Sequence, residues 1–332
     1  MKTFFLGMKN ELRIVKETSD GYEVSSQLKG THPSRLAFDP ENRGHVYCST
    51  NGDGLFKSGD GGENWKRIGE DDIQSDRVTA VAVDENGIVY AGTEPSHLYY
   101  SEDKGGTWKE FRGIQTLPSK VNWSFPPRPE THFVRWITPS ISNPENIGVS
   151  IEAGAFIRTE DGGFSWIDRP ENGPQDTHTL LAHPDAPDRL YSASGDRAYA
   201  ESTDNGRTWT YMNDGLGNLK YLYHMVINPN NPNDRFVSAS RSARHAHGAI
   251  YSSVFRKVGD EAWQETADGL PKKGAYTQVL AADPIEEDVF YALTNHGVFQ
   301  LSAGATSWTK LDIEWSNDYV RHQPKCFAVV DY

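Results

Sequence analysis

Ionisable and polar side chains recur at the start of a repeated apolar run, and their types suit acid–base chemistry on a small polar molecule. Aligned on the Asp-Pro-like turns that end most of the runs, one level reads Ser34, Thr79, Arg135, His178, Tyr223, Gln278 and Cys326. Two residues earlier, on the same side of an extended strand, come His32, Arg77, Phe133, Asp176, Tyr221, Tyr276 and Pro324. Two residues later the level is apolar, with Leu36, Val81, Ile137, Leu180, Met225, Leu280 and Ala328. The sequence therefore predicts a polar mouth above a packed interior.

The residues at this mouth predict a catalytic set for an anionic or carbohydrate-like substrate. An arginine binds a carboxylate through two parallel hydrogen bonds, a glutamate near a histidine serves as acid and base, and a tyrosine donates a proton or stabilises charge. We expect the catalytic residues to be Glu152, His178, Tyr223 and Asp176. Each residue taken alone is also compatible with a purely structural role, so the prediction rests on their gathering at one end of the repeats.

Substrate binding is expected from neighbouring loops and from two long segments, 117–136 and 241–248. The first segment carries aromatic residues among four prolines, which predicts a stiff aromatic wall, and loops of this length are usually functional. The alternative is a solvated insertion without a role. The expected substrate-binding residues are Arg135, Arg77, His132, Glu94, Arg241, Arg128, Trp123 and Trp136.

Metal binding is the weaker alternative for this mouth. Imidazoles that converge on one axis can hold Zn, Mn or Fe, but His245 and His247 are the only closely spaced pair of histidines, and they lie in a loop. The sequence therefore predicts no cofactor and no metal ligand, with a metal at the histidine-rich mouth as the open alternative.

The elements that position these residues are short strands. Runs such as HVYCST, IVYAGT and RLYSAS are rich in β-branched and aromatic residues and are bounded by Gly, Asn, Asp and Pro, which is typical of strands and turns. Nothing has helical periodicity. The protein is therefore expected to be all-β.

A box of the form Ser/Thr-x-Asp-x-Gly-x-x-Trp occurs four times, at 58–65, 101–108, 159–166 and 202–209. Trp263 and Trp308 close two further units that have lost most of the box. Asp and Gly at these positions suit a tight turn, and one carboxylate per box is too few for calcium. The box is therefore interpreted as scaffold.

About four strands every 43 residues match the blades of a β-propeller. The segment 325–332 looks like a first strand without a blade, and 4–16 and 21–28 look like a blade without its first strand. Pairing them would close the ring and remove exposed edges. We expect one domain, residues 1–332, folded as a seven-bladed β-propeller whose seventh blade combines 1–30 and 322–332.

The boxes, with the apolar run before each, resemble the Asp-box (bacterial neuraminidase repeat) superfamily of sialidases, sortilin-type receptors and photosystem II assembly factors. The nearest pattern is that of uncharacterised bacterial sialidase-like or glycosyl hydrolase-like Asp-box proteins. The resemblance implies a propeller with the boxes at its outer rim and a ligand at the axis. The Arg-Ile-Pro motif of sialidases does not occur in the sequence, which leaves sialidase activity in doubt.

The net charge and the cysteine count indicate which classes of partner and which compartment to expect. The net charge of -13 disfavours nucleic acid and an anionic membrane, because both require a basic surface. The two cysteines, Cys48 and Cys326, fit a reducing compartment, and the apolar run near the start is shorter than a signal peptide needs. We expect a cytoplasmic protein with a small-molecule or glycan ligand, no nucleic-acid or membrane partner, and an oligomeric state that the sequence leaves open.

Two functions remain at this stage. The first is an enzyme at the channel mouth, either a sialidase-like glycoside hydrolase or a lyase. The second is a non-catalytic binding or assembly scaffold, because propellers host unrelated functions.

Overall fold

The computed structural model describes residues 1–332, and almost all of its regular structure is β-strand. Seven antiparallel sheets are present, and in six of them the strands pair in chain order. The helical segments are short: α1 (Ala243–His247) and the 3₁₀ turns η1 (Arg112–Thr116), η2 (Pro118–Asn122) and η3 (Asn317–Arg321). None of them has the length and apolar character that a membrane span requires. The sheets and their topology are those of a seven-bladed β-propeller, so the predicted fold class is confirmed.

The chain forms two compact units, which are described separately. The terminal unit combines Met1–Pro33 with Met212–Tyr332, and the middle unit is Ser34–Tyr211. The terminal unit contains three sheets. Their strands are β27 (Cys326–Asp331), β1 (Lys2–Gly7), β2 (Leu12–Thr18) and β3 (Gly21–Gln27); β19 (Tyr221–Asn228), β20 (Asn231–Ser240), β21 (Ser253–Val258) and β22 (Gln264–Glu265); and β23 (Val279–Ala282), β24 (Phe290–Thr294), β25 (Gly297–Leu301) and β26 (Thr309–Lys310).

The middle unit contains four sheets. Their strands are β4 (Pro33–Phe38), β5 (Val46–Thr50), β6 (Leu55–Ser58) and β7 (Lys66–Ile68); β8 (Val78–Val83), β9 (Val89–Thr93), β10 (Leu98–Ser101) and β11 (Lys109–Glu110); β12 (Val134–Pro139), β13 (Ile147–Ile151) and β14 (Ala155–Thr159); and β15 (Thr177–His183), β16 (Ala186–Ser194), β17 (Ala198–Ser202) and β18 (Thr210–Tyr211). The third of these sheets has three strands, and a single bridge between Arg158 and Ile167 takes the place of a fourth.

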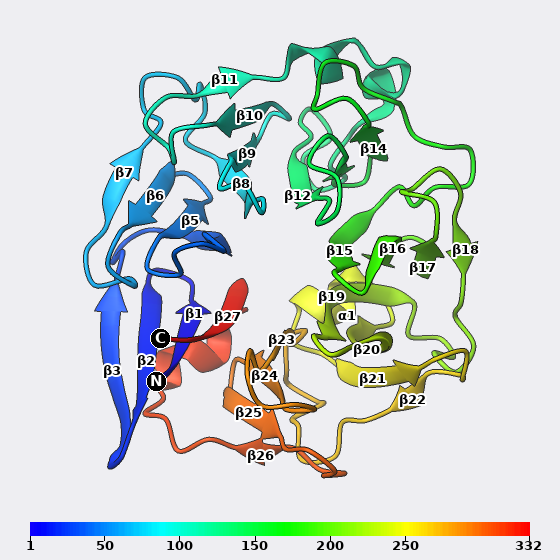
Figure 1. The fold of residues 1–332 in the computed structure, drawn as a ribbon. Helices are drawn as coiled ribbons and strands as arrows, with labels where there is room; N and C mark the ends of the chain where they lie inside the picture. The colour runs from blue at the N-terminus through cyan, green and yellow to red at the C-terminus, as the bar shows by residue number, and fades with distance from the viewer. The chain divides into compact units, whose positions relative to one another are not determined.

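The two ends of the chain share one sheet, as predicted. The last strand, β27, pairs antiparallel with β1, with Phe5 opposite Ala328, and Figure 1 shows the two termini side by side. The amino group of Met1 lies 2.6 Å from the Asp331 carboxylate. The predicted composite blade is therefore present, and β1 has a partner on both edges.

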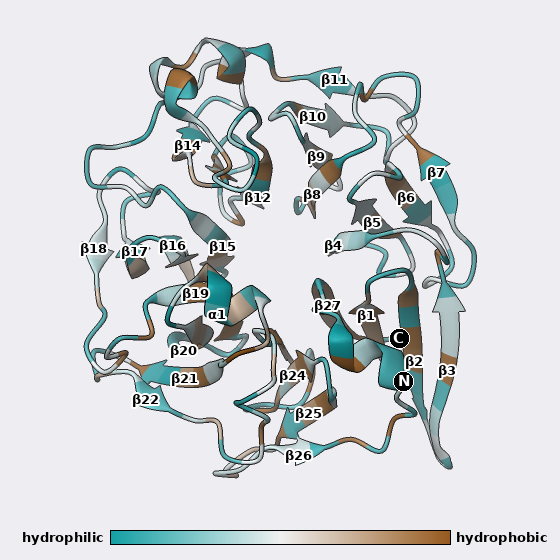
Figure 2. Ribbon diagram, turned by 180° about the vertical axis from the view of Figure 1, so that it is seen from behind, coloured by the Kyte–Doolittle hydropathy of each residue, from teal (hydrophilic) through white to brown (hydrophobic).

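Strands form where β-branched and aromatic residues can be buried on both faces. All five residues of β5, VYCST, are buried, and so are all five of β9, VYAGT. In Figure 2 the hydrophobic stretches lie largely in strands such as β2, whereas the connecting loops are mostly hydrophilic. The core of each unit thus lies within and between its sheets.

The box turns are built by their own side chains. In the first box the amide of Gly62 donates to Ser58 Oγ at 2.8 Å, and the amide of Asn64 donates to Asp60 Oδ1 at 2.9 Å. Trp65 Nε1 donates to the carbonyl of Gly62 at 2.8 Å. The box connects the third and fourth strands of its sheet. The scaffold interpretation is therefore supported by the contacts of the turn itself.

Neighbouring sheets of the middle unit approach closely along their first strands. Thr79 Oγ1 on β8 donates to the carbonyl of Val134 on β12 at 2.7 Å. A Cβ atom at Gly92 on β9 would lie 2.4 Å from a methyl carbon of Val134. This close approach fixes the spacing between the second and third sheets of the middle unit, which carry Glu94 and Arg135.

Candidate functional site

One end of each sheet in the middle unit collects the residues that precede the first strand and those that follow the second. The amide of Glu94 donates to the carbonyl of Arg77 at 3.0 Å, and the amide of Gly195 donates to the carbonyl of Asp176 at 2.9 Å. Glu152 makes the same bond to Phe133 at 3.0 Å. Glu94, Glu152 and Asp176 therefore lie at the same end of their sheets, as the repeat alignment predicts.

Four of the predicted residues form one cluster at this end. His178 Nε2 lies 3.6 Å from Glu152 Oε1 and 3.7 Å from Asp176 Oδ2. Arg135 Nε lies 3.3 Å from Glu152 Oε2. Arg135 and His178 come from the adjacent first strands β12 and β15, Glu152 follows β13, and Asp176 directly precedes β15. We call Arg135, Glu152, Asp176 and His178 the charged cluster.

The charged cluster is largely withdrawn from water. The side chain of His178 is 1% exposed, those of Glu152 and Arg135 are 11% and 13% exposed, and that of Asp176 is 20% exposed. Buried charges at this density are costly unless they compensate one another. The cluster meets this condition with two carboxylates against one guanidinium and one imidazole, and Asp176 offers the most accessible side chain.

The electrostatics of the cluster shift two pKa values. Burial opposes the charged form of His178, but the carboxylates of Glu152 and Asp176 outweigh it and raise the pKa of His178 above its ordinary value. Burial also raises the pKa of Asp176, helped by the nearby charge of Glu152 and opposed by His178. Groups with shifted pKa values in one place are typical of functional sites.

The arrangement can do two kinds of chemistry. An imidazole with two carboxylates can exchange protons with a bound molecule. The same three side chains can hold a cation, because one donor atom from each of Glu152, Asp176 and His178 lies within 4.8 Å of the other two. In either case Arg135 is placed to attract an anionic group.

A second ionic cluster lies on the preceding sheet. Arg128 Nη1 lies 2.5 Å from Glu94 Oε1, and Arg128 Nη2 donates to Glu94 Oε2 at 2.9 Å. Arg77 Nη1 lies 3.5 Å from Glu94 Oε2. Glu94 is only 4% exposed, so Arg128 ties the long segment 117–136 to a buried carboxylate. Three of the predicted substrate-binding residues are thereby brought together.

The aromatic wall expected from segment 117–136 is wrong for Trp123. Its ring is 4% exposed and belongs to a core cluster, and its Nε1 donates to Ser119 Oγ at 2.9 Å. His132 packs edge-on against the Trp123 ring, and burial lowers the pKa of His132. Trp123 directly follows η2, and its ring lies against the third sheet of the middle unit, beside Gly154. Trp123 therefore anchors segment 117–136 to the core of the middle unit.

A cavity of about 430 Å³ follows the first strands of the four sheets of the middle unit. It is lined by the apolar level that the sequence predicts, here Leu36, Val81, Ile137 and Leu180. Trp136 also lines it, and the guanidinium of Arg35 lies 4.8 Å from the centre of the Trp136 ring. The strand alignment missed Arg35, because it lies between two aligned levels and strand alternation alone assigns it to the opposite side.

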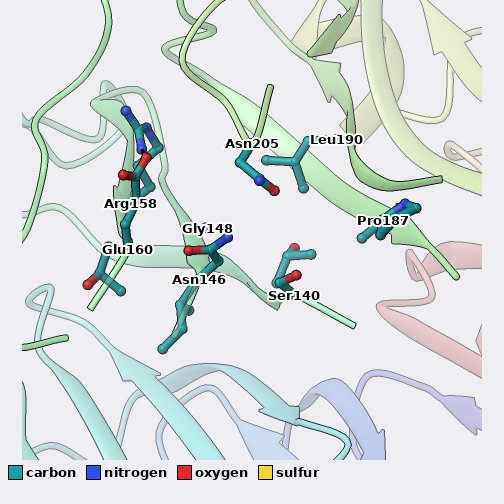
Figure 3. A pocket seen from close by; sticks show the side chains of 12 residues that line it. Ser140, Asn146, Gly148, Arg158, Glu160, Pro187, Leu190 and Asn205 are labelled. Atoms are coloured by element: carbon teal, nitrogen blue, oxygen red, sulfur yellow. Dashed lines mark hydrogen bonds and ion pairs between the residues drawn. The ribbon is translucent and has the colours of Figure 1, made fainter. Parts of the chain in front are cut away.

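The pocket in Figure 3 lies at the other end of the third and fourth sheets of the middle unit. Side chains of Ser140, Asn146, Arg158, Glu160 and Asn205 line it. Its volume is about 10 Å³, which is room for about one water molecule. None of the predicted site residues lines this pocket, so it is not a competing site.

Two predicted residues belong to the terminal unit. Tyr223 is 5% exposed, and its ring packs edge-on against His247. Arg241 is exposed in the loop that leads to α1. His247 also accepts or donates a hydrogen bond with Tyr221 at 2.8 Å and with Gln323 at 2.9 Å. A catalytic role for Tyr223 and a binding role for Arg241 stay predictions.

Comparison with known proteins gives fold neighbours only. No protein-family model matches this sequence, and no curated protein is similar enough to count as a relative. Among solved structures, a GH74 enzyme from Niastella koreensis matches with a TM-score of 0.65 and 21% identity over 83% of this chain and 46% of its own. The GH74 xyloglucanase from Xanthomonas campestris matches with a TM-score of 0.64 and 14% identity over 98% of this chain and 54% of its own.

A third neighbour has a different kind of role. YCF48 bound to D1 peptide matches with a TM-score of 0.60 and 17% identity over 85% of this chain and 82% of its own. This chain spans about half the length of the two GH74 proteins. At these identities the likenesses support the propeller fold, and they leave the activity to be argued from the site.

Proposed function

We propose that the protein binds a small anionic, carbohydrate-like molecule at the charged cluster and acts on it as a glycoside hydrolase or a lyase. The observation that carries this proposal is the burial of two carboxylates, an imidazole and a guanidinium in one chain of contacts of 3.3 Å (Arg135–Glu152), 3.6 Å (Glu152–His178) and 3.7 Å (His178–Asp176) at one end of the sheets. The fold likeness to two GH74 enzymes, one of them a xyloglucanase, adds support for a carbohydrate substrate.

In this proposal Arg135 binds the anionic group of the substrate, and Glu152, Asp176 and His178 form the catalytic set. Arg77 and Arg128, whose side chains are 46% and 37% exposed, contact a more distant part of the substrate and are held in place by the buried Glu94. Trp136, which lines the cavity of the middle unit, is the further contact in this proposal. The chemistry needs a group that stabilises negative charge and a group that moves a proton. The charged cluster contains both.

The test is a binding and turnover screen with the full chain against uronic acids, acidic oligosaccharides, neutral glucans and lactones. We expect an acidic saccharide to bind, and Arg135→Ala to weaken its binding by at least tenfold, because a hydrogen bond to a charged group contributes about 1.5–3 kcal/mol. Glu152→Gln and His178→Ala should abolish turnover. Arg112→Ala is the control, because the Arg112 side chain is 88% exposed. Equal binding by the wild type and by Arg135→Ala would exclude this site.

The second candidate function is a protein-binding scaffold. Phe164 is 94% exposed and Val121 is 88% exposed, both in the middle unit, and exposed apolar side chains mark interaction sites when they form a patch. The likeness to YCF48 bound to D1 peptide favours the same class. If this function holds, Phe164→Ser will abolish capture of a peptide or protein partner, while Arg135→Ala leaves it unchanged.

A further inference from the structure

In the charged cluster, Glu152 and Asp176 both turn an oxygen toward the same nitrogen of His178, which proton exchange does not require. Glu152 Oε1 and Asp176 Oδ2 both face the same nitrogen, His178 Nε2, at 3.6 and 3.7 Å. Good N–H···O hydrogen bonds are about 2.7–3.2 Å long, so neither distance is that of a tight hydrogen bond. One donor atom of each of the three residues lies within 4.8 Å of the other two.

The separations suit a bound cation. Atoms that bind one Zn²⁺ at about 2.0–2.2 Å lie about 3–4 Å from one another, depending on the angle. The distances from His178 Nε2 to the two carboxylate oxygens fall in this range. The three donor atoms all lie within 4.8 Å of one another, so a small inward movement of the carboxylates completes one face of a coordination shell.

The remaining oxygens of the two carboxylates are held by other groups. Asp176 Oδ1 accepts a hydrogen bond from the amide of Ala153 at 2.9 Å, and Glu152 Oε2 lies 3.3 Å from Arg135 Nε. Outer contacts of this kind orient the ligands of a metal and are a regular part of metal sites. Each carboxylate therefore has one oxygen engaged by another group and its other oxygen toward His178 Nε2.

We propose that Glu152, Asp176 and His178 bind a divalent first-row metal ion, and that the catalytic set acts on its substrate through that ion. An imidazole with two carboxylates favours ions such as Zn²⁺ or Mn²⁺ over Ca²⁺ or Mg²⁺, which take oxygen ligands. The second half of this inference rests on the proposed function, whereas the ion site itself does not.

The ion would also favour the binding of an anion at this place. Two carboxylates and one guanidinium leave the site with one negative charge when His178 is neutral. A divalent cation turns this into one positive charge. Arg135, 3.3 Å from the Glu152 ligand, would add a second positive charge beside the ion, which suits a substrate carboxylate. Three protein ligands with open positions are the usual composition of a catalytic metal site.

The experiment measures ion binding by the full chain after treatment with a chelator. Equilibrium dialysis against Zn²⁺, and separately Mn²⁺, should give one tightly bound ion per chain in the wild type. Asp176→Asn and His178→Ala should each weaken this binding by at least tenfold. The matched control is His97→Ala, because His97 Nδ1 lies 2.6 Å from a single carboxylate, that of Glu110, on the same unit. The control should bind as the wild type does.

X-ray absorption of the zinc-loaded wild type is a second readout that needs no variant. We expect a first shell of oxygen with one imidazole and no sulfur. A wild type that binds no more Zn²⁺ or Mn²⁺ than His178→Ala, or a shell without an imidazole, overturns the metal site. If the ion binds but no acidic saccharide is turned over, only the proposed function fails. Turnover that persists fully in chelator overturns the role of the ion and leaves the function in place.

Discussion

The sheet that joins the two ends of the chain depends on a buried ion pair whose loss should be measurable. Lys2 Nζ on β1 lies 2.7 Å from Asp283 Oδ2, and the two side chains are 11% and 0% exposed. Lys2 also contacts Glu286 at 2.6 Å, and Asp283 accepts a hydrogen bond from Tyr291 at 2.9 Å. The pair connects the terminal sheet with the turn that follows β23.

The perturbation is Lys2→Met, which keeps an unbranched side chain one atom shorter and removes the charge. Removing one partner of a buried pair costs about 3–5 kcal/mol. Asp283 keeps its bonds from Tyr291 and from the amides of Ile285 and Glu286, which places the loss at the lower end, about 3 kcal/mol. For a chain of 332 residues, with an unfolding entropy of about 2.1 cal/mol/K per residue, this corresponds to a fall in Tm of about 4 °C.

The pH dependence follows from the pKa of Asp283. Burial raises this pKa, but the ammonium of Lys2, with the amide donors of the turn, outweighs burial and holds it below its ordinary value. A carboxyl with a lowered folded pKa contributes stability above its unfolded pKa, and the contribution is lost as the pH falls through the folded pKa. In Lys2→Met the folded pKa rises toward the unfolded one, so the variant has less stability to lose in acid, and the difference between wild type and variant should shrink as the pH falls below about 4.

The assay is urea unfolding at neutral pH and at two acidic pH values, followed by tryptophan fluorescence. Lys109→Met is the control, because its ion pair with Glu102 is 62% and 58% exposed and exposed pairs contribute about 0–1 kcal/mol. The double variant Lys2→Met with Asp283→Asn should recover part of the loss. A cost for Lys2→Met no larger than that for Lys109→Met would refute the reasoning.

Three further predictions concern the middle unit. Gly92→Ala should destabilise it by about 1–3 kcal/mol in chemical unfolding, because the new methyl overlaps the side chain of Val134; an unchanged midpoint would contradict the close approach of β9 and β12. Arg128→Ala leaves the buried Glu94 with Arg77 alone, so proteases should cut segment 117–136 faster, whereas cleavage at the wild-type rate would show that another contact holds it. Hydrogen bonds from Thr107 and Ser101 lower the pKa of Asp103 to about 2, so Asp103→Asn should lose stability relative to the wild type at neutral pH, and the difference should shrink as the pH falls from about 4 toward 2; a difference that is constant with pH would contradict this.

The strand pattern of this protein is local information, and the sequence carries it almost completely. The runs VYCST and VYAGT combine β-branched, aromatic and small residues, and they form the buried strands β5 and β9. The box at 58–65 specifies its own turn, because its Ser, Asp and Gly residues bond within eight positions. The period of the tryptophans then predicts the number of sheets, and two incomplete ends predict that β27 pairs with β1.

The gathering of Arg135, Glu152 and His178 follows from the same repeats. Equivalent positions in successive sequence repeats lie at the same end of their sheets. Aligning the repeats therefore places these residues close together within the middle unit. Their meeting in space could therefore be predicted. Their use of particular oxygens and nitrogens could not be predicted, because it depends on the amide of Ala153 and on side-chain torsions that no repeat specifies.

The tertiary structure alone decided the contacts between the long loops and the sheets. The sequence places Trp123 among prolines and predicts an exposed aromatic side chain, but its ring lies in the core beside Gly154. Burying a large apolar ring is more favourable than exposing it. The pairing of Arg128 with Glu94 likewise joins residues 34 positions apart. Local periodicity determines strands, turns and their number, whereas the direction in which a long insertion folds depends on the space and charges left by sheets that are distant in the chain.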